Sequence, residues 1–147
     1  MDAKATTALL NELVETLKDG QKGYADAMTD VEDTRLKDTF KKFAVQRSEY
    51  LTELEDQMFK LNLKPDESGS VTAKVHRAWI DLKAAITNKD SNAMLNECER
   101  GDGYAVTAYQ TALKATDLPS ALQSVIEKQY QGVQAALTTI KSLRDAS

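Results

Sequence analysis

The stretch DTRLKDTFKKFAVQRSEYLTELEDQMFKLN, residues 33–62, decides the fold because its apolar side chains recur every three or four residues. This spacing places them on one face of an α-helix and predicts a helix with one buried side that ends at about Asn62. Asp33 is the predicted N-cap, since a short acidic side chain accepts hydrogen bonds from the first free N–H groups of a helix. The apolar row consists of Leu36, Phe40, Phe43, Tyr50, Leu54, Met58 and Leu61.

The same spacing continues on both sides of this stretch. Residues from about 3 to 28 form a predicted helix before it, and residues 90–116 form another after it. A last helix follows Asp117, its predicted N-cap, with Pro119 in the first turn, where the missing N–H costs little. The chain therefore contains four long amphipathic helices.

The segment between the second and third long helices has a different composition. Residues 62–70 gather proline, glycine and acidic residues and predict a loop, and residues 70–87 predict a shorter helix. A helix of about 26 residues is roughly 39 Å long, and this segment can travel that length. We predict an all-α, single-domain protein over residues 1–147: a ferritin-like four-helix bundle with a long crossover that carries a short extra helix.

Composition and charge argue against several classes of function. The net charge is −4, with acidic and basic residues interleaved, so no basic stripe is present for nucleic acid. The sequence shows neither a signal-peptide pattern nor an apolar run near the ~18 residues of a membrane span. The single cysteine, Cys98, cannot form an internal disulfide. We expect a cytoplasmic protein that binds neither nucleic acid nor membranes.

Five of the six glycines lie inside predicted helices, where each costs about 1 kcal/mol relative to alanine. The first and third helices share a near-repeat, DGQKGYA at residues 19–25 and RGDGYA at residues 100–105. Such glycines either let helices approach closely or leave room around a polar group. The five are Gly20, Gly23, Gly101, Gly103 and Gly132.

The apolar rows are interrupted by polar residues near the middle of all four helices. A buried belt of this kind must be hydrogen-bonded internally or bound to an ion, because unpaired buried charge is very costly. We predict that Gln21, Gln46, Glu99 and Gln129 face one another. The belt also includes Arg47 and Asp102, with Glu49 and Glu53 beside it.

Four stretches carry a resemblance to a known family. They are LNELVETLKDGQKGY (10–24), GSVTAKVHRAWIDLKAAI (69–86), NECERGDGYAVTAYQTAL (96–113) and LQSVIEKQYQGVQAAL (122–137), of which HRAWIDLK and ECERG are the more specific parts. The chain resembles the ferritin-like four-helix-bundle family of uncharacterised bacterial proteins, a domain of unknown function often found near stress-related genes. The resemblance implies fold and kinship, because that family has no established activity.

The match to a di-iron site is incomplete. Such bundles supply one Glu from each of two helices and a Glu-x-x-His pair from each of the others, whereas no long helix here contains a histidine. One reading is a weak, exchangeable divalent cation (Mn, Mg, Ca or Fe), held mainly by Glu49, Glu99 and Asp102. The other is a hydrogen-bonded polar layer that fixes helix register. The candidate ligands are Gln21, Gln46, Glu49, Glu99, Asp102 and Gln129.

Three further side chains have simpler interpretations. His76 lies on the predicted crossover helix, where a polar residue at the edge of an apolar face is favoured over a ligand or base. Trp79 is expected to anchor that helix to the bundle. Cys98 falls on an inward row and is expected to be a small buried residue rather than a reactive thiol.

Two hypotheses for function follow. The first is a non-catalytic structural, assembly or stress-related protein that forms a homodimer through bundle or crossover surfaces. The alternative is a divalent-metal-binding protein with di-metal oxidase or peroxide-handling activity. The missing histidines argue against redox iron, while the aligned carboxylates favour metal binding, so the sequence leaves open whether the protein is an enzyme.

Overall fold

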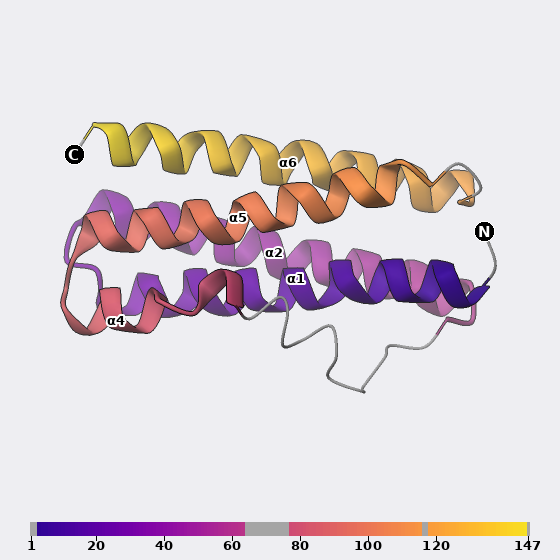
Figure 1. Cartoon of the computed structure of the whole chain (residues 1–147), viewed down its shortest axis with the longest axis horizontal. Coiled ribbons are helices and arrows are strands. Elements are labelled where there is room, and N and C mark those ends of the chain that lie inside the picture. Colours follow the sequence, from indigo (N-terminus) through magenta and orange to yellow (C-terminus); the bar gives the residue numbers. More distant parts are fainter. Residues whose placement is uncertain (1–2, 64–76, 116–117, 147) are drawn as a thin grey trace.

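The computed structural model describes residues 3–63, 77–115 and 118–146. Four long helices lie side by side (Figure 1): α1 (Ala3–Asp30), α2 (Thr34–Lys60), α5 (Ser91–Leu113) and α6 (Ser120–Asp145). Two short elements precede α5, the 3-10 helix η1 (Arg77–Trp79) and α4 (Leu82–Thr87). The described part of the chain holds helices and no strand, which confirms the predicted all-α bundle.

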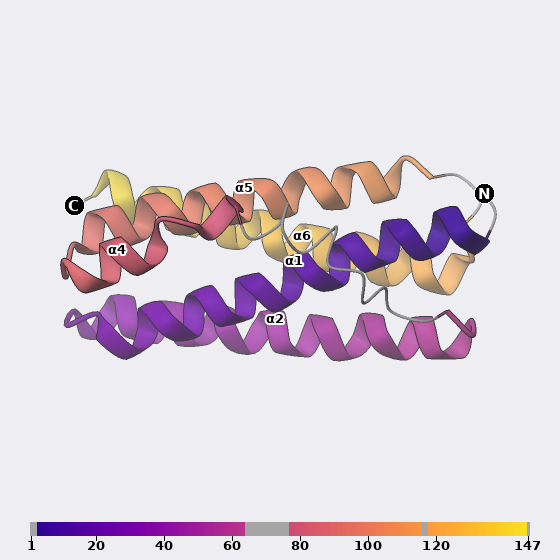
Figure 2. The same ribbon diagram turned by 60° about the horizontal axis from the view of Figure 1, so that its bottom comes forward.

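The long helices form two antiparallel hairpins. One is built from α1 and α2, and the other from α5 and α6. Helix α2 ends at one end of the bundle and α5 begins at the opposite end, so the connection between them traverses the bundle (Figure 2). Helices α2 and α5 therefore run in the same direction, and the bundle has one long crossover, as the sequence predicts.

Capping side chains mark where two of the helices begin. Asp33 Oδ1 accepts hydrogen bonds from the backbone N–H groups of Arg35 at 2.8 Å and Leu36 at 3.1 Å. Asp90 Oδ1 accepts one from Ala93 at 3.0 Å. Each carboxylate satisfies donors that a helix leaves free in its first turn, and the predicted cap at Asp33 is confirmed.

The start of α6 and the extent of the short helix before α5 differ from the prediction. Pro119 is the N-cap of α6 rather than a residue of its first turn, and Asp117 lies outside the described residues. Within residues 77–87 the expected short helix is divided by a turn into η1 and α4. Residues 70–76 of that prediction lie outside the described part.

The apolar core is divided into two clusters along the bundle axis. On α2, Phe43 belongs to one cluster and Leu54 to the other. On α5, Cys98 belongs to the same cluster as Phe43, and Ala105 belongs to the same cluster as Leu54. The buried side chains that lie between the clusters on these two helices, Arg47 and Asp102, are polar, and they are the centre of the site described next.

Candidate functional site: a buried polar layer

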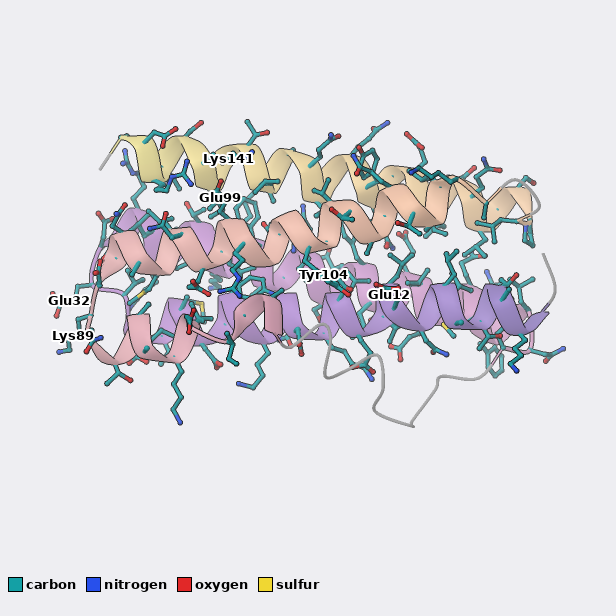
Figure 3. All side chains as sticks on the ribbon, in the orientation of Figure 1. Glu12, Glu32, Lys89, Glu99, Tyr104 and Lys141 are labelled. Atoms are coloured by element: carbon teal, nitrogen blue, oxygen red, sulfur yellow. The ribbon has the colours of Figure 1, made fainter. Side chains whose placement is uncertain are left out.

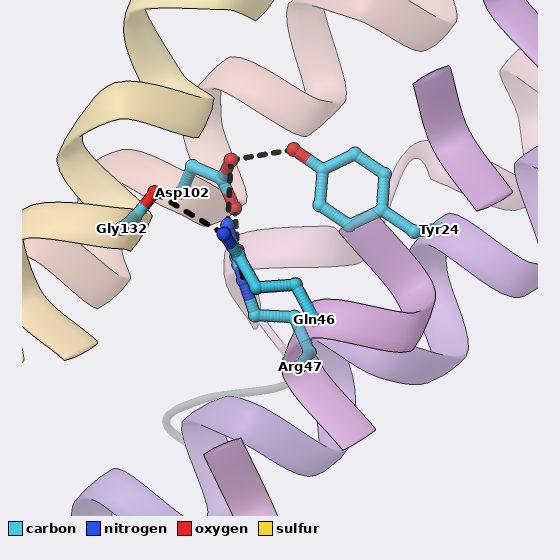
Figure 4. Close-up of polar contacts among 5 residues, drawn as sticks. All are labelled: Tyr24, Gln46, Arg47, Asp102 and Gly132. Atoms are coloured by element: carbon cyan, nitrogen blue, oxygen red, sulfur yellow. Dashed lines mark hydrogen bonds and ion pairs between the residues drawn. The ribbon is translucent and has the colours of Figure 1, made fainter. Parts of the chain in front are cut away.

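Arg47 of α2 and Asp102 of α5 form an ion pair at the boundary between the two clusters. Their side chains are 1% and 0% exposed. Arg47 Nη1 donates to Asp102 Oδ1 at 2.7 Å, and Nη2 donates to Oδ2 at 3.2 Å (Figure 4). This is the bidentate geometry for which a guanidinium is suited. The paired bonds offset the large cost of removing both charges from water.

Tyr24 of α1 binds the same carboxylate. Its hydroxyl donates to Asp102 Oδ2 at 2.5 Å, and the Arg47 guanidinium carbon lies 5.4 Å from the centre of its ring. Burial raises the pKa of the Tyr24 phenol well above its usual value, and the Asp102 carboxylate raises it further. Burial alone would lower the pKa of Arg47, but Asp102 and Tyr24 together raise it. The phenol therefore remains a donor and the guanidinium remains charged.

Gln46 connects this ion pair to α6. Arg47 Nε donates to Gln46 Oε1 at 3.1 Å, and Gln46 Nε2 donates to the carbonyl oxygen of Gly132 at 3.5 Å (Figure 4). Through Tyr24 and Gln46 the network around the charged pair therefore reaches all four long helices.

A second polar group surrounds Gln129 of α6, whose side chain is fully buried. Tyr109 donates to Gln129 Oε1 at 2.6 Å, while Gln129 Nε2 donates to the Tyr50 carbonyl at 3.0 Å and to Glu53 Oε1 at 2.9 Å. Burial alone would raise the pKa of Glu53, but hydrogen bonds from Lys128 and Gln129 lower it. Together the two groups form the polar layer: Tyr24, Gln46, Arg47, Tyr50, Glu53, Asp102, Tyr109 and Gln129.

Two of the helical glycines leave room for this layer. A Cβ added at Gly20 would lie 3.2 Å from Arg47 Nη1, and one at Gly132 would lie 1.9 Å from the Tyr50 hydroxyl oxygen. At Gly103, by contrast, an added Cβ would meet nothing within 4 Å. Glycine at the first two positions therefore makes space for large polar side chains, which is one of the two roles expected from the sequence.

The other two helical glycines make space for Trp79. An added Cβ would lie 2.6 Å from the Trp79 ring at Gly23 of α1 and 2.0 Å from it at Gly101 of α5. The indole packs edge-on against Tyr24, with ring centres 5.5 Å apart and planes at 73°. Trp79 therefore anchors η1 in a slot between α1 and α5, which confirms the expected anchoring role.

The six candidate ligands occupy different environments. Gln46, Asp102 and Gln129 belong to the polar layer. Gln21 is half-buried on α1, and Glu49 is exposed on α2.

The prediction that Glu99 faces the layer is wrong. Its carboxylate pairs with Arg144 of α6, and it lines a shallow hollow between α5 and α6 that Lys141 also borders (Figure 3). Glu99 precedes Asp102 by three residues, so the two side chains leave the helix roughly 60° apart. That rotation turns Glu99 toward α6 while Asp102 points into the core.

The metal-binding arrangement expected from the sequence stays a prediction. Among the described residues, no group of three or more His, Cys, Asp or Glu side chains is placed to hold a metal ion. Both oxygens of Asp102 already accept hydrogen bonds from Arg47 and Tyr24. A cation would have to displace these donors to bind Asp102 there.

Cys98 is a free, fully buried cysteine next to the layer. Burial raises the pKa of its thiol well above the usual value, and Asp102 raises it further. The expectation of a small buried residue is confirmed, and its low reactivity stays a prediction. His76 lies outside the described residues.

Sequence reasoning included Arg47 in the belt but did not pair it with Asp102. The available signal was that each residue interrupts an inward apolar row, Arg47 between Phe43 and Tyr50 and Asp102 between Cys98 and Ala105. Two opposite charges on the inward faces of different helices have a strong reason to meet, because each would otherwise be buried without a partner.

A model of a family described as a domain of unknown function, DUF2383, matches residues 5–115. The chain belongs to this family. The DUF2383 match includes α1, α2 and α5, and thus Tyr24, Arg47 and Asp102, but it ends before α6. No curated protein sequence matches the chain. None of the described helices combines the length and apolar character needed to cross a membrane.

Proposed function

We propose that this DUF2383 protein is a non-catalytic bundle with a structural, assembly or stress-related role, in which the polar layer specifies how the helices pack. The observation that carries the proposal is the full engagement of Asp102. Its side chain is 0% exposed, and its oxygens accept hydrogen bonds from Arg47 and Tyr24. A carboxylate held in this way fixes the positions of α1 and α2, which carry its two partners, relative to α5.

The physical basis is the difference between polar and apolar contacts. Apolar contacts are non-directional, so a helix that slides by a turn can bring its apolar side chains against new apolar partners. The same slide would separate Arg47 from Asp102 and leave two buried charges unpaired, which costs several kcal/mol. The ion pair thus favours one register of α2 against α5.

The double variant Arg47→Met with Asp102→Leu tests this role, because it replaces the charges by apolar groups. We expect the variant to remain helical by circular dichroism but to give broadened, poorly dispersed amide NMR signals. Leu54→Met, an apolar exchange in the neighbouring cluster, is the control and should keep a sharp spectrum. A double variant with a spectrum as sharp as that of the wild type would refute a role in register.

The alternative function is divalent-metal binding with di-metal oxidase or peroxide-handling activity. The resemblance to ferritin-like bundles motivates it, and a four-helix bundle with one long crossover is the topology of that fold. Anaerobic calorimetric titration with Mn²⁺ and Fe²⁺ tests it, with Glu99→Gln as the candidate variant and Glu55→Gln, an exposed carboxylate of α2, as the control. Tight binding of two iron equivalents followed by oxygen consumption would establish the alternative and overturn our proposal.

The assembly we infer is a homodimer in the cytoplasm. Large apolar side chains at Phe59 and Ile80 are 83% and 63% exposed, and Cys98 is a free thiol that suits a reducing compartment. Sedimentation equilibrium of the wild type should give twice the 16.2 kDa chain mass. Phe59→Ser and Ile80→Ser should identify the surface involved, and a monomer at every concentration would refute the dimer.

A further inference from the structure

The strap, which we define as residues 77–87, comprises η1 and α4 and lies against α1 and α5 (Figures 1 and 2). Its two helices have three and six residues, lengths that are unstable without tertiary contacts. At the N-cap of α4, Asp81 makes no capping hydrogen bond through its side chain. The buried apolar side chains of the strap are Ala78, Leu82 and Ala85. The strap thus has a small apolar attachment.

The ionic contacts of the strap and the turn after it lie at the surface. Asp81 pairs with Arg100 at 3.2 Å, and these side chains are 66% and 50% exposed. Lys89, just after the strap, lies 3.9 Å from Glu32, and both are largely exposed (Figure 3). Exposed pairs of this kind contribute little to stability. Attachment therefore depends mainly on Trp79 and the three buried side chains.

Trp79 also covers the polar layer. Its ring lies in the slot formed by Gly23 and Gly101 and contacts Tyr24, which donates to Asp102. Neither glycine carries a side chain, so the indole fills the space beside the backbone at both positions. A groove of about 730 Å³ between α1 and the strap already extends to Trp79 and Gly23.

We propose that the strap opens as a local unit while the four long helices stay folded, and that opening uncovers the polar layer and Cys98. Segments with few buried apolar contacts open at a lower free energy than the core of a protein. Cys98 belongs to the same apolar cluster as Leu82 and Ala85 of the strap, so it loses part of its cover when the strap leaves. The strap is in this sense a lid built into the crossover.

Cys98 provides the measurement, because it is the only cysteine in the chain. The rate at which a thiol reagent modifies native protein is recorded at increasing urea concentrations, and global unfolding is followed by circular dichroism. Local opening exposes less surface than unfolding, so the labelling rate should depend on urea less steeply than global unfolding does. Equal dependence on urea would show that Cys98 becomes accessible only in the unfolded chain, and would overturn the proposal.

A pair of variants separates the strap from the rest of the core. Trp79→Ala loosens the strap, whereas Leu122→Ala truncates a fully buried side chain in the other apolar cluster. The two variants are compared at urea concentrations that give them the same free energy of unfolding. Under these conditions Cys98 in Trp79→Ala should be labelled at least about tenfold faster than Cys98 in the control. If Trp79→Ala does not fold, Leu82→Ala takes its place. Equal labelling of strap and control variants would overturn the proposal.

Discussion

Replacing Asp102 by asparagine should destabilise the protein by about 3–5 kcal/mol, the usual cost of breaking a buried ion pair. The substitution keeps the shape of the side chain but leaves the Arg47 guanidinium, which is 1% exposed, without its counter-charge. The hydrogen bond from Tyr24 also loses its charged acceptor. With a urea dependence of about 2 kcal/mol per molar, the unfolding midpoint should fall by about 2 M.

A double-mutant cycle distinguishes the ion pair from general disruption of the core. The single variants of the cycle are Arg47→Met and Asp102→Leu. Each should cost as much as Asp102→Asn, because each leaves one buried charge without its ionic partner. The double variant Arg47→Met with Asp102→Leu should lie within about 1 kcal/mol of the wild type or above it, because no buried charge remains. Our reasoning fails if Asp102→Asn costs less than about 1 kcal/mol, or if the double variant shows the sum of two single losses.

Glu97 Oε2 is buried without a hydrogen-bond partner and lies 3.9 Å from Arg100 Nη1, and burial raises the Glu97 pKa more than Arg100 lowers it, so Glu97→Gln should stabilise the protein by about 0.5–1 kcal/mol at neutral pH. This increase in the free energy of unfolding, measured with urea, should vanish below the usual carboxyl pKa. A decrease at neutral pH would contradict the prediction. Lys89 has a φ of 53°, so Lys89→Gly should raise stability by roughly 0.5–1 kcal/mol in the same assay, and no change would argue against strain there. Burial raises the phenol pKa of Tyr24, Tyr50 and Tyr109 above that of the unfolded chain, so stability should fall as pH rises above about 10. Tyrosinate absorbance from these residues should appear together with the loss of helical circular dichroism. Ionisation of these phenols in a bundle that stays folded would contradict the role of burial in raising their pKa.

The helices and their order could be predicted because the information for them is local. The row from Leu36 to Met58 specifies a buried helix face within one stretch of chain, and Asp33 caps that helix through its own neighbours. The long segment between α2 and α5 predicted a crossover, because a connection of that length can span the bundle. The existence of a buried polar belt followed in the same way from polar residues on inward rows.

The partners within that belt were decided by the tertiary structure. Arg47 and Asp102 lie on different helices, and no local pattern specifies the rotation that makes them meet. The same rotation turns Glu99 toward Arg144, although it precedes Asp102 by three residues. The slot for Trp79 likewise needs glycines from both α1 and α5. Spacing along a helix determines which residues share a face, but helix rotation and axial position arise from packing the whole bundle, so contacts between helices require the assembled structure.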